Sequence, residues 1–412
     1  MDRLVPISFA VDSRPTHGHF STSAPAMTDR NRTLDVFRGA TVALMILVNN
    51  PGSWASLYPP LAHATWHGWT LTDLVFPFFL FAVGNAIALT PTRTTSNTQF
   101  WKRWTRRTLL IFGIGLLLNV WPFVKWGADG SLQFKEFETL RIMGVLQRIA
   151  LCWACAALIV RSGGVRAAWF CSAFLLIGYW WACVAFAHGV DPYSLEGFFG
   201  TTLDRVLLGE SHLYRGEGVP FDPEGLASTT PAIAQVLLGY AVGHFLLQRQ
   251  QAKSLVRDLL LIAIVAAVIG SFAHELMPIN KKLWTSSYAL LTTGLATLSI
   301  AVLLQCLDRW RWQHLLIEPL LRGCEAFGRN ALLIFALTGL VPRTLALIRF
   351  EESTDLAGNP QYVTLLSRLH REFFAPLSAD PRLGSFLFAV VTLLVYWLVA
   401  EWLHRRRWYF KA

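Results

Sequence analysis

The stretch LGSFLFAVVTLLVYWLVAEW, residues 383–402, contains one charged side chain, Glu401, and is followed by the basic sequence HRRR at 404–407. A helix of about 20 apolar residues spans the hydrocarbon core of a bilayer. Lipid offers the backbone no hydrogen-bond partner, so such a run must satisfy its own amide groups as a helix. We interpret the stretch as a membrane-spanning helix with a basic, cytoplasmic end.

Apolar runs of similar length recur along most of the chain. Hydrophobic residues make up 54% of the 412 positions and charged residues only 15%, whereas soluble domains carry about 25% charged residues. The 17 tryptophans also suit a protein with two membrane interfaces. The pattern predicts an all-α, polytopic integral membrane protein, a bundle of about ten transmembrane helices. Their expected bounds are 34–50, 71–90, 108–126, 142–160, 166–187, 229–247, 257–276, 284–306, 324–345 and 383–402.

Two polar segments lie outside these runs. Residues 1–31 contain no apolar stretch long enough for a signal peptide, and we expect a disordered N-terminal tail there. Residues 350–380 are polar with short apolar pieces, which suggests one interfacial or re-entrant helix. The rest of the chain, from 32 to 412, is then a single transmembrane domain.

The net charge of +10 arises mainly from basic residues gathered in short loops. Basic loops determine membrane topology, so no nucleic-acid partner is expected. Segment 92–107 has five basic and no acidic residues, whereas 189–228 has seven acidic and two basic residues. The positive-inside rule places 92–107 in the cytoplasm and 189–228 outside, together with the 51–70 loop. Both termini are then cytoplasmic, while Lys281 and Lys282 fall unexplained on the outer side.

The outer segment NNPGSWASLYPPLAHATWHGWTLTD, residues 49–73, is rich in polar and aromatic groups. Its histidines, His63 and His67, are four residues apart. A neutral imidazole near pH 7 suits a general base, although an interfacial histidine is more often a plain hydrogen-bonding residue. A zinc site would need a third ligand, so we expect no metal site. Asp73 begins the second span, where a helix N-terminus favours an acid and capping alone can explain it.

Polar side chains inside the expected spans indicate a cavity. Arg148 lies about two turns inside the fourth span, where a charge is costly unless it is paired or hydrated. Asp35 and Arg38 open the first span as an i,i+3 pair or as helix-end anchors. Gln147 and Asn330 add further polar groups. These residues alone leave open whether the protein is a transporter or a membrane enzyme.

A set of ordered motifs adds a resemblance to a known family. They are RTLDVFRGATVALMILVNNPG at 32–52, HATWHGWTLTDLVFPFFLFAVG at 63–84, RIMGVLQRIA at 141–150, FDPEG at 221–225, NKKLWTSS at 280–287 and GRNALLIF at 328–335. Together they resemble the heparan-α-glucosaminide N-acetyltransferases, most closely the bacterial relatives of that family. The resemblance implies that residues 32–412 form a transmembrane acyltransferase domain. Such a domain takes acetyl-CoA from the cytosol and acetylates a sugar amine across the membrane.

The resemblance also implies which residues form the catalytic site. The family's catalytic histidine lies in a motif similar to KHASWNGLT, which aligns with AHATWHGWT here and falls on His63. The family's asparagine, in a VNYGG-like context, falls on Asn49 in LVNNPG. Asn49 is expected either to orient His63 or to donate to the developing oxyanion. His67 stands where the family motif has an asparagine, so no role is carried over to it.

Other candidates follow from charge and position. CoA phosphates approaching from the cytoplasmic side need positive partners. The candidates for cofactor binding are Arg38, Arg106 and Arg107. The candidates for substrate binding are Asp73, Arg148, Lys281 and Asn330.

The favoured function is a membrane acyltransferase in the bacterial inner (cytoplasmic) membrane. It would transfer acetyl from acetyl-CoA to a hexosamine or another periplasmic glycan, with His63 as the base in a direct transfer or as a transiently acetylated nucleophile. The rival function is an inner-membrane carrier for N-acetylglucosamine or a related amino sugar, although the two halves show no convincing repeat. Expected partners are the lipid bilayer, acetyl-CoA and the glycan acceptor, and a homo-oligomer is left open.

Overall fold

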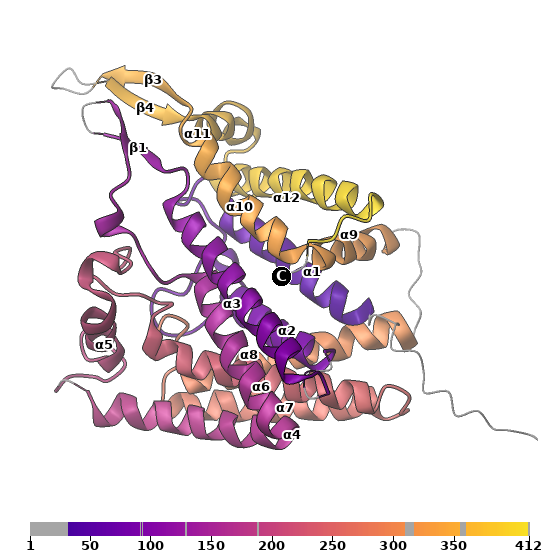
Figure 1. Ribbon diagram of the computed structural model, residues 1–412. Helices are drawn as coiled ribbons and strands as arrows, with labels where there is room; N and C mark the ends of the chain where they lie inside the picture. The colour runs from indigo at the N-terminus through magenta and orange to yellow at the C-terminus, as the bar shows by residue number, and fades with distance from the viewer. Residues whose placement is uncertain are drawn as a thin grey trace, which may run out of the picture. The chain divides into compact units, whose positions relative to one another are not determined.

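The computed structural model describes residues 32–90, 92, 94–127, 130–187, 189–309, 317–354 and 360–410. The expected N-terminal tail, residues 1–31, lies outside the described residues. The described chain is mostly helical (Figure 1). Its helices are α1 Arg32–Asn49, α2 Val75–Ala88, α3 Asn97–Val120, α4 Val145–Ala185, α5 Phe199–Leu208, α6 Leu226–Gln248, α7 Leu255–Phe272, α8 Ser286–Leu304, α9 Glu318–Arg329, α10 Ala331–Leu345, α11 Leu365–Leu369 and α12 Pro381–Arg405.

Each expected span coincides with a helix, but about ten membrane spans are not confirmed. Among the described residues, five helices are long and apolar enough to cross a membrane, and the bent pair α9–α10 would make a sixth. The five are Val145–Ala185, Leu226–Gln248, Leu255–Glu275, Ser286–Leu307 and Pro381–Arg405. By contrast, α1 carries three charged residues, α3 has four in its first half, and α2 has only 14 residues.

The expected fourth and fifth spans are joined in α4, which runs through 41 residues with a break at Gly164. The break has φ 61° and ψ −143°, a conformation that glycine adopts at little cost because it lacks a Cβ. Near this break, Arg161 donates hydrogen bonds to the carbonyl of Thr95 at 2.7 Å and to Asn97 Oδ1 at 2.8 Å. The apolar pattern therefore located both halves of α4, and the basic residue between them fastens the break to the start of α3.

Helix α2 is central because it packs against α1, α4, α6 and α8. Phe76 and Leu80 share a hydrophobic cluster with residues of α4, α6 and α8, while Phe81 belongs to a second cluster with α1 and α8. Gly84 of α2 meets the backbone of α6 so closely that an added Cβ would collide with the Val236 carbonyl. Small residues permit such close helix contacts in membrane proteins. Helix α2 is therefore held firmly along its length.

Two antiparallel hairpins were not predicted from the sequence. The strands are β1 Val124–Trp126, β2 Leu132–Phe134, β3 Arg349–Thr354 and β4 Pro360–Thr364. Helix α3 ends at Val120, before the Trp121-Pro122 pair, because a residue that precedes proline disfavours the helical conformation. Within 350–380, where one interfacial or re-entrant helix was expected, β3 and β4 occupy the start, and helical structure follows only from Leu365 to Leu377.

Candidate active site

His63 and Asp73 form the centre of the candidate site. His63 Nδ1 lies 2.7 Å from Asp73 Oδ1. The other carboxylate oxygen accepts hydrogen bonds from the backbone amides of Ala64 and Thr70, each at 3.0 Å. The side chain of Asp73 is 2% exposed and that of His63 is 45% exposed. The loop that precedes α2 thus wraps around a buried carboxylate and leaves the imidazole ring accessible.

The contact with Asp73 favours one form of the imidazole. A carboxylate only accepts hydrogen bonds, so the neutral ring carries its proton on Nδ1 and donates it to Asp73. Nε2 is then free of a proton and can accept one, as a general base must. Both polar contacts of the His63 ring within the described chain are made by Nδ1.

Lys281 joins this pair from the segment before α8. Its Nζ lies 3.2 Å from Asp73 Oδ1 and 3.0 Å from His63 Nδ1. Burial lowers the pKa of Lys281 from its ordinary value, and the charge of Asp73 opposes that shift. The amide of Gly68 donates to the carbonyl of Ile279 at 2.7 Å, which holds the two loops together. The lysine that the positive-inside rule left unexplained therefore contacts the candidate catalytic residues.

The neighbours Lys282 and His67 take different positions. Lys282 Nζ donates to the Thr65 carbonyl at 2.8 Å and to Glu217 Oε2 at 2.7 Å. His67 Nδ1 lies 3.4 Å from Asn280 Nδ2. Burial lowers the pKa of His67 from its ordinary value. Neither residue bonds to the His63 ring among the described contacts, and Lys282 braces the loop that carries it.

Asn49 is the last residue of α1, and its side chain is exposed. No hydrogen bond joins Asn49 to His63 in the part of the chain that the structure describes. The preceding Val48 belongs to one hydrophobic cluster with Leu61 and Val75, so the end of α1 lies beside the loop that carries His63. Asn49 is thus near this loop, and of its two expected roles the structure does not form the contact that would orient His63.

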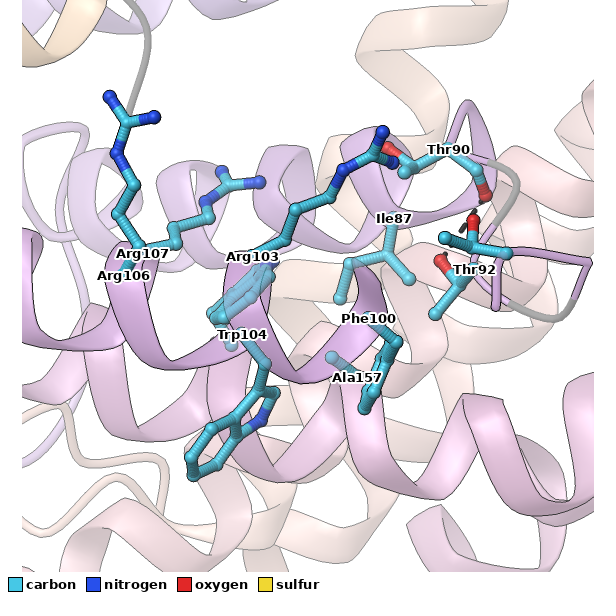
Figure 2. A pocket seen from close by; sticks show the side chains of 11 residues that line it. Ile87, Thr90, Thr92, Phe100, Arg103, Trp104, Arg106, Arg107 and Ala157 are labelled. Carbon is cyan, nitrogen blue, oxygen red and sulfur yellow. Dashed lines mark hydrogen bonds between the residues drawn. The ribbon is translucent and has the colours of Figure 1, made fainter. Parts of the chain in front are cut away.

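A basic cavity of about 360 Å³ lies at the other end of α2 (Figure 2). It is lined by three arginines of α3, of which Arg106 and Arg107 were expected and Arg103 was missed. Figure 2 shows these arginines on one side of α3, with the rings of Phe100 and Trp104 on the other. The i,i+3 and i,i+4 spacing of Arg103 with the other two was the signal available in the sequence.

Arg107 and Arg38 lie close enough for their positive charges to repel each other. The Arg107 guanidinium stacks 4.7 Å from the Trp153 ring centre. Arg38 donates to the Gly328 carbonyl at 3.2 Å and pairs with Asp35 at 3.4 Å. The three cofactor-binding candidates therefore gather in one region, although Arg38 does not line the cavity itself.

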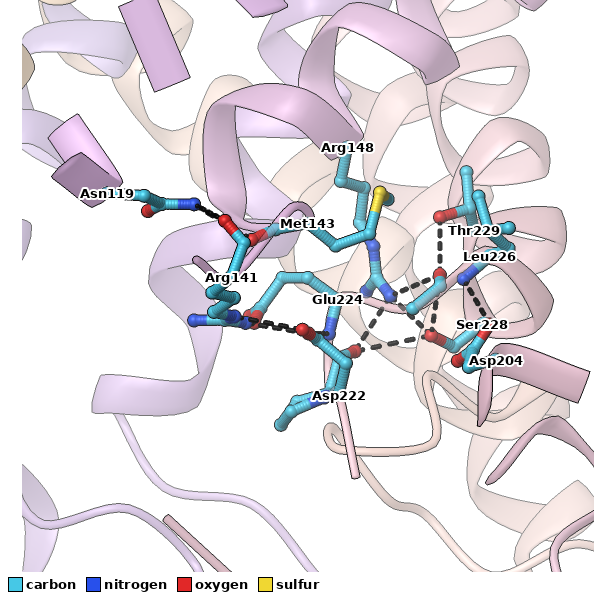
Figure 3. Close-up of polar contacts among 12 residues, drawn as sticks. Asn119, Arg141, Met143, Arg148, Asp204, Asp222, Glu224, Leu226, Ser228 and Thr229 are labelled. Carbon is cyan, nitrogen blue, oxygen red and sulfur yellow. Dashed lines mark hydrogen bonds and ion pairs between the residues drawn. The ribbon is translucent and has the colours of Figure 1, made fainter. Parts of the chain in front are cut away.

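Arg148 is fully buried (Figure 3), and none of its side-chain hydrogen bonds among the described residues goes to His63. Its Nη2 donates to the carbonyls of Pro223 and Gly225, at 2.7 and 3.2 Å, and to the hydroxyl of Ser228. Its Nε and Nη1 are buried without a hydrogen-bond partner among the described residues. The arginine thus holds the turn before α6 in place. Its three acceptors offset part of the cost of burying its charge.

An acidic cluster surrounds that turn. Asp222 and Glu224 both bind Arg141, through contacts of 2.6 and 2.5 Å to its Nη2 (Figure 3). Asp204 accepts a hydrogen bond from the Leu226 amide at 2.8 Å, and burial raises the pKa of Asp204 to about 6. Arg141, Asp222 and Glu224 stand in the motifs RIMGVLQRIA and FDPEG, but the sequence indicated no role for them, because their pairing depends on how the 189–228 segment folds back.

Asn330 lies at the 84° bend between α9 and α10 and is fully buried. Its Nδ2 donates to the Trp408 carbonyl at 3.0 Å, and its Oδ1 accepts from the Phe410 amide at 3.0 Å. The side chain is therefore used within the protein. Of the four residues expected to bind substrate, the structure brings only Asp73 and Lys281 to His63.

Comparison with known proteins agrees with the ordered motifs. A family profile described as the catalytic region of heparan-alpha-glucosaminide N-acetyltransferase matches residues 30–277. The human heparan-alpha-glucosaminide N-acetyltransferase is 25% identical over 400 residues, which cover 81% of this chain and 57% of the human protein. The mouse protein of the same name is 27% identical over 367 residues, which cover 74% of this chain and 53% of the mouse protein. The chain spans a little over half the length of these relatives.

The matched region contains the His63–Asp73 pair, the arginines of the basic cavity and the turn held by Arg148. It covers more than half of the chain, and several apolar helices agree with an integral membrane protein. The chain therefore belongs to the heparan-alpha-glucosaminide N-acetyltransferase catalytic family.

Proposed function

We propose that the protein is a membrane acetyltransferase that moves an acetyl group from cytosolic acetyl-CoA to an amino sugar, or another glycan acceptor, on the periplasmic side. The proposal includes a bacterial inner-membrane location with both termini in the cytoplasm. The observation that carries it is the pair formed by an accessible His63 ring and a buried Asp73 carboxylate 2.7 Å away. Family membership and the N-acetyltransferase names of the two relatives support the reaction type.

The chemistry is an acyl transfer assisted by a general base. The acceptor nitrogen attacks the thioester carbonyl carbon, and the carbon–nitrogen bond forms while His63 Nε2 takes the proton. The carbon–sulfur bond then breaks, and the departing sulfur takes that proton to give the CoA thiol. Asp73 stabilises the imidazolium through Nδ1 during the transfer. Asn49, at the end of α1 beside this loop, would donate to the developing oxyanion.

The basic cavity is the proposed site for the CoA phosphates. Guanidinium groups bind phosphate through charge-assisted hydrogen bonds, and aromatic walls suit an adenine ring. The 14 residues of α2 separate this cavity from Asp73, a span of about 20 Å at 1.5 Å per residue. A ligand that serves both ends must be long, with phosphates at one end and a reactive group at the other, as acetyl-CoA is.

The rival proposal is a carrier for an amino sugar. Carriers often bind substrate at broken helices, and α9–α10 is such a break. The amide of Asn330 at this break is already bonded to the C-terminal segment at 3.0 Å, so it offers little to a passing sugar. This occupied break favours the enzyme.

The test is acetyl transfer by purified protein in detergent or liposomes, with labelled acetyl-CoA and a panel of hexosamines. His63→Ala should retain expression and CoA binding but lose transfer by on the order of 10²–10⁴-fold, the usual contribution of a general base. His67→Ala is the matched control and should lose far less, because His67 lies outside the Asp73 pair. Near-normal transfer by His63→Ala would refute the mechanism.

The same preparation distinguishes the remaining alternatives. Label that stays on His63 when acceptor is omitted would replace direct transfer by an acetyl-histidine route. Sugar flux into liposomes that is independent of acetyl-CoA and survives His63→Ala would instead identify a carrier.

A further inference from the structure

The His63 ring lies between two opposite charges that meet at one nitrogen. Asp73 Oδ1 is 2.7 Å from Nδ1, and Lys281 Nζ is 3.0 Å from the same atom. Lys281 also lies 3.2 Å from the same carboxylate oxygen, so the three groups form a closed triangle. The carboxylate comes from the turn before α2 and the ammonium from the segment before α8.

Other charges near the triangle are occupied elsewhere. Lys282 pairs with Glu217 at 2.7 Å. Glu224 acts electrostatically on Lys281, but its carboxylate binds Arg141 at 2.5 Å. Asp73 and Lys281 are therefore the charges in direct contact with the ring among the described residues.

The two contacts on Nδ1 act on the ring in opposite directions. A carboxylate beside an imidazole favours the protonated ring, whereas an ammonium disfavours it. Nδ1 cannot donate to Asp73 and accept from Lys281 at once, because it holds either a proton or a lone pair. The contact with Asp73 is the shorter one, so we place the Nδ1 proton between the ring and the Asp73 carboxylate. Lys281 then binds the carboxylate and weakens the attraction between the carboxylate and the ring.

We propose that Lys281 is a positioning residue that limits the proton affinity of His63 by sharing the Asp73 carboxylate. The proposal rests on the function proposed above. A base in acyl transfer must release the proton that it takes, here to the departing sulfur. A buried carboxylate without a compensating positive charge favours the protonated form of a neighbouring imidazole, which then gives up a proton less readily. Lys281 therefore acts on the reaction through Asp73 and His63. The proposal requires no contact between Lys281 and the acceptor.

The first experiment titrates the ring directly in the full-length protein. Diethylpyrocarbonate modifies unprotonated imidazole, and peptide mass spectrometry follows His63 separately from the other histidines. In Lys281→Met, modification of His63 should require a pH about one unit higher than in the wild type. Even in water, the repulsion between two unit charges at this distance corresponds to a pKa difference of about one unit. Lys281→Arg, which keeps the positive charge, should restore most of the wild-type profile. Lys282→Met removes a neighbouring charge of the same sign and should move the profile far less, because Lys282 contacts Thr65 and Glu217 but neither the ring nor Asp73.

The second experiment measures kcat/KM for acetyl transfer against pH. The acid limb of the Lys281→Met profile should move upward by about the same one unit, so the rate at a pH well below the wild-type midpoint should fall by roughly 10-fold. KM for acetyl-CoA should stay close to the wild-type value. A wild type without transfer activity would refute the proposed function, while the chemical titration would still test Lys281.

The proposal is overturned if Lys281→Met titrates at His63 as the wild type does. A thermal unfolding midpoint for each variant controls for misfolding, and Lys281→Gln, which keeps polar bulk without charge, replaces the methionine variant if that variant does not fold. A purely structural lysine would lower stability without moving the His63 titration, and this result would also overturn the proposal.

Discussion

At the scale of single residues, Asp73 is the most constrained group in the candidate site. One carboxylate oxygen accepts hydrogen bonds from the amides of Ala64 and Thr70 and, at 3.2 Å, from the Thr70 hydroxyl. The other oxygen contacts the His63 ring and Lys281. So many donors leave the side chain one orientation. The imidazole of His63 is therefore oriented before any substrate arrives, which is the condition that catalysis by a positioned base requires.

Replacing the carboxylate by an amide tests this orientation. Asp73→Asn keeps the size of the side chain but lets it donate a hydrogen bond to Nδ1, which places the ring proton on Nε2, the wrong nitrogen. We expect kcat for acetyl transfer to fall by on the order of 10²–10⁴-fold with a small change in KM. Steady-state kinetics would check this, and Thr70→Val, which removes one donor to Asp73, should have a much smaller effect. Unchanged kcat in Asp73→Asn would show that the pair is not used.

The residue types of this site were predictable, but their pairing was only partly so. His63 and Asn49 were identified by motif, and Asp73 was recognised as an acid at a helix start. That a loop of ten residues folds so that Asp73 points back at His63 depends on backbone bonds that no sequence pattern displays. Lys281 is distant in sequence, and contacts between the two loops bring it into place, among them the bond from the Gly68 amide to the Ile279 carbonyl and that from Lys282 to the Thr65 carbonyl.

At the scale of helices, α3 combines an apolar half with a half that carries the basic cavity. Arginines three and four residues apart share one face of a helix, which turns them toward a common ligand. The cavity is also lined by Thr90, Thr92 and Thr95 of the segment after α2. The hydroxyls of Thr90 and Thr92 donate to the carbonyls of Ala86 and Thr90, so the proposed phosphate contacts there come from the arginines.

The cavity proposal predicts a specific kinetic change. Arg103→Gln and Arg106→Gln should each raise KM for acetyl-CoA by roughly 10-fold while leaving kcat nearly constant, because a phosphate contact made in both ground and transition states affects binding alone. Kinetics at varied acetyl-CoA and calorimetry with CoA would measure it. Lys102→Gln is the control, since Lys102 is exposed on the same helix and does not line the cavity. An unchanged KM in both arginine variants would remove the cavity from the CoA path.

Helix positions were more predictable than helix ends or helix roles. Long apolar runs located all the larger helices, because hydropathy depends on composition over many residues. Some features depend on only a few local residues, namely the end of α3, the break at Gly164 and the hairpins β1–β2 and β3–β4. A hydropathy pattern taken over many residues does not resolve such features. Arg349 illustrates this: its guanidinium lies 3.7 Å from the Trp126 ring and 3.8 Å from the Tyr362 ring, so one cation joins the two hairpins.

For the whole molecule, the proposed reaction requires that the two ends of α2 face opposite sides of the membrane. The arginines of α3 should meet the cytoplasm, where acetyl-CoA is made. The His63 loop and the acidic 189–228 segment should face outward. The distribution of basic residues supports this arrangement.

Accessibility labelling tests the orientation. In a cysteine-free background, Glu196→Cys should react with a membrane-impermeant maleimide in cells with a permeabilised outer membrane, because Glu196 is exposed in the acidic segment. Thr98→Cys, exposed at the start of α3, should react only after the inner membrane is broken. The reverse pattern would place His63 in the cytoplasm and refute transfer across the membrane.

The bond between Asn330 and the C-terminal segment also bears on how the chain is made. The amide at the α9–α10 bend finds its partners in Trp408 and Phe410, 78 and 80 residues later along the chain. A ribosome makes Trp408 and Phe410 only after the bend itself has been made. The buried amide of Asn330 therefore stays without these partners until residues 408–410 have been synthesised. The segment that secures the break is thus made well after the two helices that it joins.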